Sequence, residues 1–320
     1  MTRWNPLTAA VALGIASAAL AGCAPQPVDT DTSESTAVVD AFLAHLEAGE
    51  AREAAALTTI EFDDALVDDA FYRASAALPT DAHIVSSTGS ADGAAVTVEF
   101  AFDGVDAPVT LELGTSRDGD EVKIDRLGPA ERIGAPAPVP GTLIVNDRVE
   151  FPLLEPAAEV ALLPGAYAVE YADPTGLLEG AGGASAFTAY VPEVVAADGS
   201  IIGTGFAFTP VFMQDVEPGL ADALARLQAA CEADGFAGPS CPAGFPTEPR
   251  ESSSTEWFPK TEPQIVFLDG EFATTAEYDV VFWNGDDSTT VEASYTGTVS
   301  RDASGSITFT PSAGSAGSAG

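Results

Sequence analysis

The sequence is poor in basic residues, in cysteine and histidine, and in long hydrophobic runs. Only 12 Lys and Arg stand against 49 Asp and Glu, which gives the 320 residues a formal net charge of −37. A nucleic-acid-binding protein needs a basic patch to neutralise phosphates, so this balance argues against that class. The same charge opposes electrostatic attachment to anionic lipid headgroups. After residue 20, no apolar run is long enough to span a bilayer.

Residues suited to catalysis are equally scarce. Three Cys and two His leave little material for a metal site or a nucleophile, and we interpret His45 and His83 as structural. The motifs Gly-x-Ser-x-Gly, Ser-x-x-Lys and His-Glu-x-x-His are absent, as is a glycine-rich phosphate loop with Lys. We therefore expect a protein that is not an enzyme and that uses no cofactor and no metal.

Paired carboxylates leave two less favoured alternatives open. Adjacent acids occur at Asp63-Asp64, Asp68-Asp69 and Asp286-Asp287. Two carboxylates suffice for a glycosidase, so a cell-wall hydrolase is a third hypothesis. Clustered acids also suit Ca²⁺, but the EF-hand pattern is absent, and solvated turns explain these pairs more simply.

The N-terminus carries the strongest pattern in the chain. Arg3 provides a short positive region, and the apolar stretch from Leu7 to Leu20, about 14 residues, suits a signal peptide better than a membrane span. The stretch ends in Leu20-Ala21-Gly22-Cys23. These residues resemble the lipobox of bacterial lipoproteins. The resemblance implies removal of residues 1–22, lipidation of Cys23, and anchoring at the extracytoplasmic face of the cell membrane. An ordinary secretory signal is the alternative.

The lipid anchor and the composition of the following residues predict how the folded part is held at the membrane. Two or three acyl chains hold a protein stably where one is marginal. Residues 23–35 are polar and acidic and predict a flexible stalk, which suits a body that an anionic membrane repels. The excess of Arg over Lys, 10 against 2, indicates a GC-rich genome such as that of an actinobacterium.

The remaining cysteines, Cys231 and Cys241, predict a disulfide. An exported chain meets an oxidising compartment, where two cysteines at this spacing pair readily. A metal site would require two further ligands. A reactive thiol pair would require the closer spacing Cys-x-x-Cys and a basic neighbour. Both are less favoured alternatives.

Residues 36–128 predict a domain in which helices precede strands. Apolar residues at helical spacing predict one helix that begins at Ser33 or Ser35 and ends at Gly49, and another from about Phe62 to Leu78. The apolar period then changes to two, which predicts antiparallel strands joined by Asp-Gly turns. The expected strands carry Val96–Phe102, Val109–Leu113 and Val122–Ile124. This order resembles nuclear-transport-factor-two-like and cystatin-like domains, which implies a curved sheet with helices on one face.

A proline-rich linker and a β-rich module are expected next. Residues 129–141 predict the linker and residues 142–192 the module. Within the module, two short strands flank the turn dipeptide Asn146-Asp147, and a strand follows Pro164-Gly165. Residues 141–172 resemble PEGA-type surface β modules.

Residues 193–311 predict a second α+β domain. Its expected parts are a strand from Gly203 to Phe212, a helix after Pro218-Gly219 and a four-stranded meander. Leu220, Leu224, Leu227 and Cys231 share one face of that helix, so we expect Cys231 to face the core. Trp257 and Phe258 lie in a proline-rich connection, where capping of the core is favoured over a partner anchor. Residues 312–320 are a low-complexity tail.

The sequence thus predicts an α+β fold in which small helix-plus-antiparallel-sheet domains flank a β-rich central module. The expected function is that of a membrane-anchored lipoprotein with a non-catalytic binding or scaffolding role toward an envelope protein. The alternative is a small-ligand-binding lipoprotein with a pocket between sheet and helices.

Overall fold

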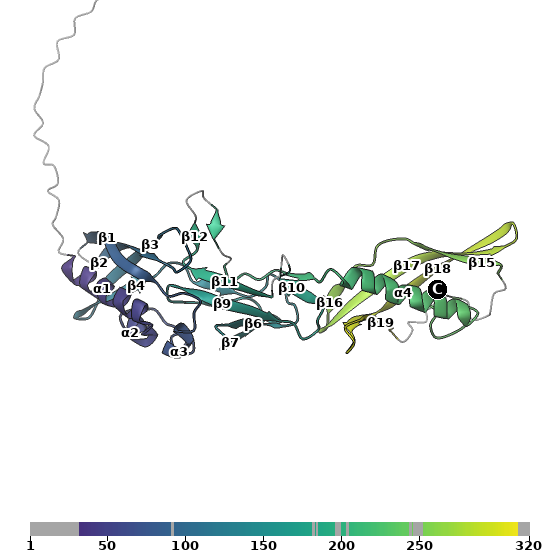
Figure 1. Cartoon of the computed structure of the whole chain (residues 1–320), viewed down its shortest axis with the longest axis horizontal. Coiled ribbons are helices and arrows are strands. Elements are labelled where there is room, and N and C mark those ends of the chain that lie inside the picture. Colours follow the sequence, from purple (N-terminus) through teal and green to yellow (C-terminus); the bar gives the residue numbers. More distant parts are fainter. Residues whose placement is uncertain are drawn as a thin grey trace, which may run out of the picture.

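The computed structural model describes residues 32–312, apart from 91–92, 181–182, 184, 196–199, 203–204, 243–244 and 246–251. The chain is mixed but strand-dominated, and its strand pairs are antiparallel, which is compatible with an α+β class. Three larger sheets follow one another along an elongated molecule (Figure 1). Cys23, the expected stalk up to residue 31 and the tail from residue 313 lie outside the described residues. The stalk prediction is wrong for residues 33–35, which form the first turn of helix α1 (Ser33–Ala48).

The N-terminal part, residues 32–126, packs a helix against a four-stranded meander. Helix α1 (Ser33–Ala48) ends at Gly49, whose φ of 69° is the left-handed conformation expected of a glycine stop. It contacts all four strands of the sheet β1-β2-β3-β4. The alternation predicted from Val96 onward is confirmed, because every second residue of β2 is buried. The strands are β1 (Thr80–Ser90), β2 (Gly93–Ala101), β3 (Val109–Asp118) and β4 (Glu121–Arg126).

The long helix expected from Phe62 to Leu78 is wrong. Only α2 (Ala51–Ala56) and the four-residue α3 (Asp69–Tyr72) form between α1 and the sheet. The carboxylate of Asp63 accepts the N–H of Ala65, and that of Asp68 accepts the N–H groups of Ala70 and Phe71. Such local bonds offer the backbone an alternative to helical hydrogen bonding, so the chain turns twice where the apolar spacing alone predicts one helix.

The central part, residues 131–212, is built on a sheet of order β11-β9-β6-β7. The predicted hairpin is confirmed, and Asn146 and Asp147 both have the positive φ that its turn requires. Part of the segment expected as a linker is structured, since β5 (Glu131–Ile133) pairs with β8 (Ala158–Val160) and Ile133 is buried. The sheet strands are β6 (Thr142–Val145), β7 (Val149–Pro152), β9 (Gly165–Ala172) and β11 (Ala186–Val191).

The strand expected from Gly203 to Phe212 is mostly wrong. In the described part of that segment, only Pro210–Phe212 forms a strand, β14, which pairs with β10 (Leu178–Gly180). Phe206 and Phe208 are buried instead as a non-strand segment that bonds Gly134. A further short pair joins β12 (Val194–Val195) to β13 (Ile201–Ile202).

The C-terminal part, residues 216–311, packs α4 (Val216–Ala233) on one face of a five-stranded sheet (Figure 1). The predicted meander is confirmed, with turns at Asp269-Gly270, Asn284-Gly285 and Gly305. The proline-rich connection contains one unexpected strand, β15, at the sheet edge. The strands are β15 (Ser254–Pro259), β16 (Val266–Leu268), β17 (Glu271–Asn284), β18 (Asp287–Arg301) and β19 (Ile307–Pro311).

Helix α4 begins earlier than expected, so Pro218 and Gly219 lie inside its first turns. Proline is tolerated there because the first N–H groups of a helix have no partner within it. None of the helices in the described part of the chain has the length and apolarity of a bilayer-spanning segment.

Candidate functional site

A groove of about 570 Å³ lies between α4 and the strands β15 and β17. Its floor is apolar, because Leu220 and Leu224 of the helix are 3% and 1% exposed and Tyr278 of β17 is 8% exposed. Trp257 of β15 forms part of the opposite wall. Small-molecule sites are typically concave and mostly apolar, with a few polar groups that orient the ligand. This groove has that composition.

The pattern of α4 explains why the groove exists. Leu220, Leu224 and Cys231 are buried against the sheet, whereas Ala221 and Ala225 are exposed and line the groove beside them. A methyl group is the only side chain at each of these alanine positions, so the helix approaches the sheet closely on one side and leaves room on the other. The spacing of large and small residues on one helix thus shapes the wall.

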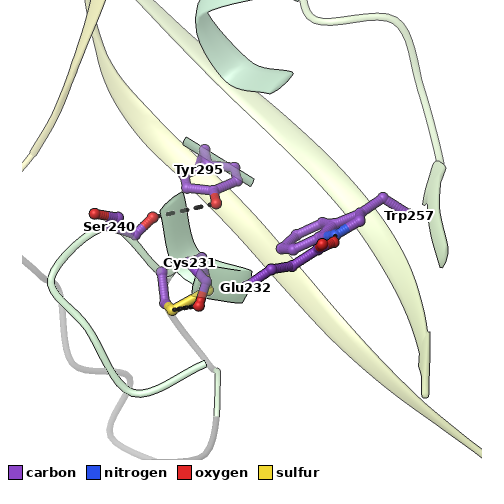
Figure 2. The surroundings of a disulfide bond; sticks show 6 residues. Cys231, Glu232, Ser240, Trp257 and Tyr295 are labelled. Carbon is purple, nitrogen blue, oxygen red and sulfur yellow. Dashed lines mark hydrogen bonds between the residues drawn. A yellow bond between two sulfur atoms is a disulfide. The ribbon is translucent and has the colours of Figure 1, made fainter. Parts of the chain in front are cut away.

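The disulfide lies at the end of α4 near Trp257, which lines the groove (Figure 2). Cys231 and Cys241 are joined as predicted, with their Cα atoms 4.7 Å apart, and Cys231 faces the core. Glu232, the next residue of α4, accepts a 2.7 Å hydrogen bond from the indole Nε1 of Trp257. The hydroxyl of Tyr295 donates to the carbonyl of Ser240, 3.2 Å away, inside the disulfide loop. Helix end, loop and sheet are therefore tied together around Trp257.

Aromatic contacts hold the Trp257 ring in place. It stacks on Phe245 with ring centres 5.5 Å apart and meets the edge of Tyr278 at 5.8 Å. Tyr295 lies behind it at 6.2 Å. The prediction that Trp257 caps the core is confirmed by these contacts, and the same ring also lines the groove. The same prediction is wrong for Phe258, which points to the other face of the sheet and is 49% exposed, because neighbouring residues of a strand lie on opposite faces.

The charged groups along the groove are all acidic. The carboxylates of Glu217 and Glu262 line it, and no Lys, Arg or His is among its described lining residues. Burial raises the pKa of the Tyr278 hydroxyl, and a hydrogen bond with Gln228 partly opposes that rise. Tyr278 is therefore a neutral hydroxyl at physiological pH, and the groove carries only negative charge.

The other residues singled out from the sequence lie away from this groove. Nδ1 of His45 is 2.8 Å from an oxygen of Glu50, and Nδ1 of His83 is 2.9 Å from the carbonyl of Asp81. Both histidines belong to the N-terminal part, one in α1 and one in β1. Within the described residues, no group of three or more His, Cys, Asp or Glu is arranged to hold a metal ion.

The sequence named Leu220, Leu224 and Trp257, but as core residues, and its alternative prediction of a pocket between sheet and helices assigned no residue to that pocket. The exposed alanines beside the buried leucines of α4 were an available signal. No sequence pattern indicates that Tyr278 forms the floor of the groove, because its position there depends on how β15, β17 and α4 pack together.

Comparisons with protein-family models, with curated proteins and with solved structures find no match for this chain.

Proposed function

We propose that the chain is a non-catalytic lipoprotein, anchored through Cys23 on the extracytoplasmic face of the membrane, which holds a small ligand in the α4 groove. The lipobox-like sequence Leu20-Ala21-Gly22-Cys23 supports the anchor. The preformed groove, with an apolar floor and one wall held by the disulfide, carries the binding role. A site that is already rigid loses little conformational entropy when it binds.

We infer two helix-plus-sheet domains that flank a β-rich module. The contacts of α1 with β1–β4 and of α4 with the C-terminal sheet support this division. The binding role is assigned to the C-terminal domain, which places the groove far from the membrane end of an elongated molecule (Figure 1).

Native mass spectrometry tests the ligand. The full chain is extracted from membranes of its host and measured beside two variants, Ala225→Trp and Ala233→Trp. Both alanines are exposed on α4, but only Ala225 lines the groove, so the indole fills the site in one variant alone. We expect a small-molecule adduct on the wild type and on Ala233→Trp, and its loss from Ala225→Trp. An adduct of equal occupancy on all three chains would contradict the proposal.

The anchor has its own test. A Cys23→Ala chain should carry no acyl mass and should retain residues 1–22, whereas the wild-type chain should begin at Cys23 and carry acyl mass on that residue. A wild-type chain that retains residues 1–22, or that lacks acyl groups, would refute the lipoprotein part of the proposal without touching the groove.

A scaffolding role is the second proposal, and one observation favours it. Val266 and Leu268 on β16 are 45% and 60% exposed at the edge of the C-terminal sheet. Exposed edge strands accept a strand from another chain. Crosslinking in cells followed by purification should then recover an envelope protein in stoichiometric yield, and a Leu268→Lys chain should lose it. Recovery of the same protein with Leu268→Lys would contradict this role.

A further inference from the structure

We propose that the ligand of the groove is a single-chain amphiphile with a cationic head, bound with its tail toward Trp257 and its head between Glu217 and Glu262. This inference rests on the proposed binding function and adds the chemical class and the orientation of the ligand.

The groove has two distinguishable ends. The N-terminal end of α4 lies near Phe272, because Phe212, which precedes the helix, packs edge-on to that ring at 5.4 Å. The C-terminal end lies near Phe282, which meets Phe236 of the disulfide loop at 4.9 Å. Helix α4 therefore runs along β17 from Phe272 toward Phe282.

The facing segment runs the opposite way. Trp257 pairs with Val280 on β17, and the chain then passes Lys260, whose N–H bonds the carbonyl of Glu277. It reaches Gln264, whose carbonyl accepts the Thr274 hydroxyl. The stretch that contains Glu262 therefore approaches the N-terminal end of α4, where Glu217 lies in the first turn.

The acidic end selects the charge of the ligand. Glu217 and Glu262 are both exposed at the groove rim, and neither is ion-paired in the described part of the chain. Glu217 also complements the dipole of α4 as a first-turn acid. Glu262 lies in no helix, so its place on the groove has no such structural explanation. Two unpaired carboxylates at one end attract a cation and repel an anionic head.

The aromatic end suits an alkyl chain. Trp257 uses its only donor on Glu232, so the ring presents carbon surface to the groove. Leu224 and Tyr278 complete an apolar surface there, where an alkyl chain is removed from water. The rim alanines give access along the helix. The arrangement thus combines a tail site and a head site in one groove.

Calorimetric titration tests the inference on the chain from residue 24 onward, which carries neither the apolar stretch Leu7–Leu20 nor acyl groups and therefore needs no detergent. The probes are decyltrimethylammonium, 1-decanol and decyl sulfate, each kept below its aggregation concentration. We expect affinity to fall in that order. The Glu217→Gln/Glu262→Gln chain should bind the cation about tenfold more weakly, as the loss of two ion pairs implies, and should bind decanol unchanged.

The matched control removes two charges elsewhere. Glu61 and Asp64 are exposed in the N-terminal part. The Glu61→Gln/Asp64→Asn chain therefore loses two negative charges, as the groove variant does, but neither of them at the groove. This chain should keep the wild-type affinity for the cation within about twofold. An equal loss in both double variants would show that general charge attracts the cation, and would overturn the inference.

The remaining outcomes separate this inference from the proposed function. Binding of decanol and cation with equal affinity, abolished by Ala225→Trp, would overturn the cationic head and leave the groove as a ligand site. Binding of a Lys-Leu hexapeptide but of none of the three probes would make the occupant a polypeptide. If the Ala225→Trp substitution removes the binding of none of these probes, both proposals are refuted.

Discussion

At the scale of single residues, Asn146 shows what a local pattern predicts and what it misses. The dipeptide Asn146-Asp147 predicts a turn, and the turn forms. The side chain of Asn146 is nevertheless buried, and it donates from Nδ2 to the carbonyl of Phe71 at 3.1 Å. Its Oδ1 accepts the N–H of Ala168 at 2.9 Å. These partners lie 75 and 22 positions away, so no local spacing reveals them.

Replacement of Asn146 by Ala should therefore destabilise the chain. The change leaves the buried carbonyl of Phe71 and the half-buried N–H of Ala168 without this partner, which costs about 2–3 kcal/mol. Asp147→Ala is the matched control, since Asp147 is exposed at a similar positive φ of 56°. Urea unfolding compares the two chains. An equal loss of unfolding free energy in both would mean that the turn conformation matters and the side-chain bonds do not.

At the scale of elements, the best-predicted region is the C-terminal meander. Alternation along β17 and along residues 293–300 of β18, with Asp-Gly and Asn-Gly turns, indicates register and turn position together. The helix expected from Phe62 failed because aspartate side chains bond the backbone, and β15 was missed because prolines surround it. The resemblance of residues 36–128 to known domain families stays a prediction.

The disulfide is the element-scale feature that most directly supports the site. A Cys231→Ser/Cys241→Ser chain should lose about 2–3 kcal/mol of unfolding free energy, as chain entropy predicts for a loop of this length. Because Glu232 adjoins Cys231 and bonds Trp257, the emission of Trp257 should also shift to longer wavelength. A Trp4→Phe/Trp283→Phe background isolates that signal. Unchanged emission in the folded variant would show that the disulfide does not position the Trp257 wall.

At the scale of the whole molecule, one side chain links the central and C-terminal parts. Arg301 of β18 donates from Nε to the carbonyl of Gly176 at 2.6 Å. Its two terminal nitrogens donate to the carboxylate of Asp215 at 2.7 and 2.8 Å. A planar guanidinium makes this forked contact and a further bond at once, which a Lys ammonium does not reproduce. Arg301 thus ties a loop of the central part to the start of α4.

Arg301→Lys should loosen this junction while each part stays folded. Small-angle X-ray scattering should show a broader distribution of interatomic distances for the variant at neutral pH, and limited proteolysis should cut faster between residues 173 and 215. Identical scattering curves for the two chains would show that packing alone, such as the Phe212 and Phe272 contact, holds the parts.

The same junction predicts a pH dependence. The hydrogen bond from Arg301 holds the pKa of Asp215 below its ordinary value of 3.8. A lowered carboxylate pKa contributes stability that is present above the ordinary value and is lost as the pH falls through the lowered one. Wild-type scattering should therefore stay constant from pH 7 to about pH 4 and approach that of Arg301→Lys only below that range. A change near pH 6 would contradict this assignment.

The most direct test of a ligand-binding groove is photocrosslinking in the host cell. A benzophenone amino acid is placed at position 225, which lines the groove, or at position 233, which does not. We expect a small-molecule mass adduct on the peptide that carries position 225 and none at position 233. Equal small-molecule adducts at both positions, or a protein-sized adduct at position 225 alone, would contradict it.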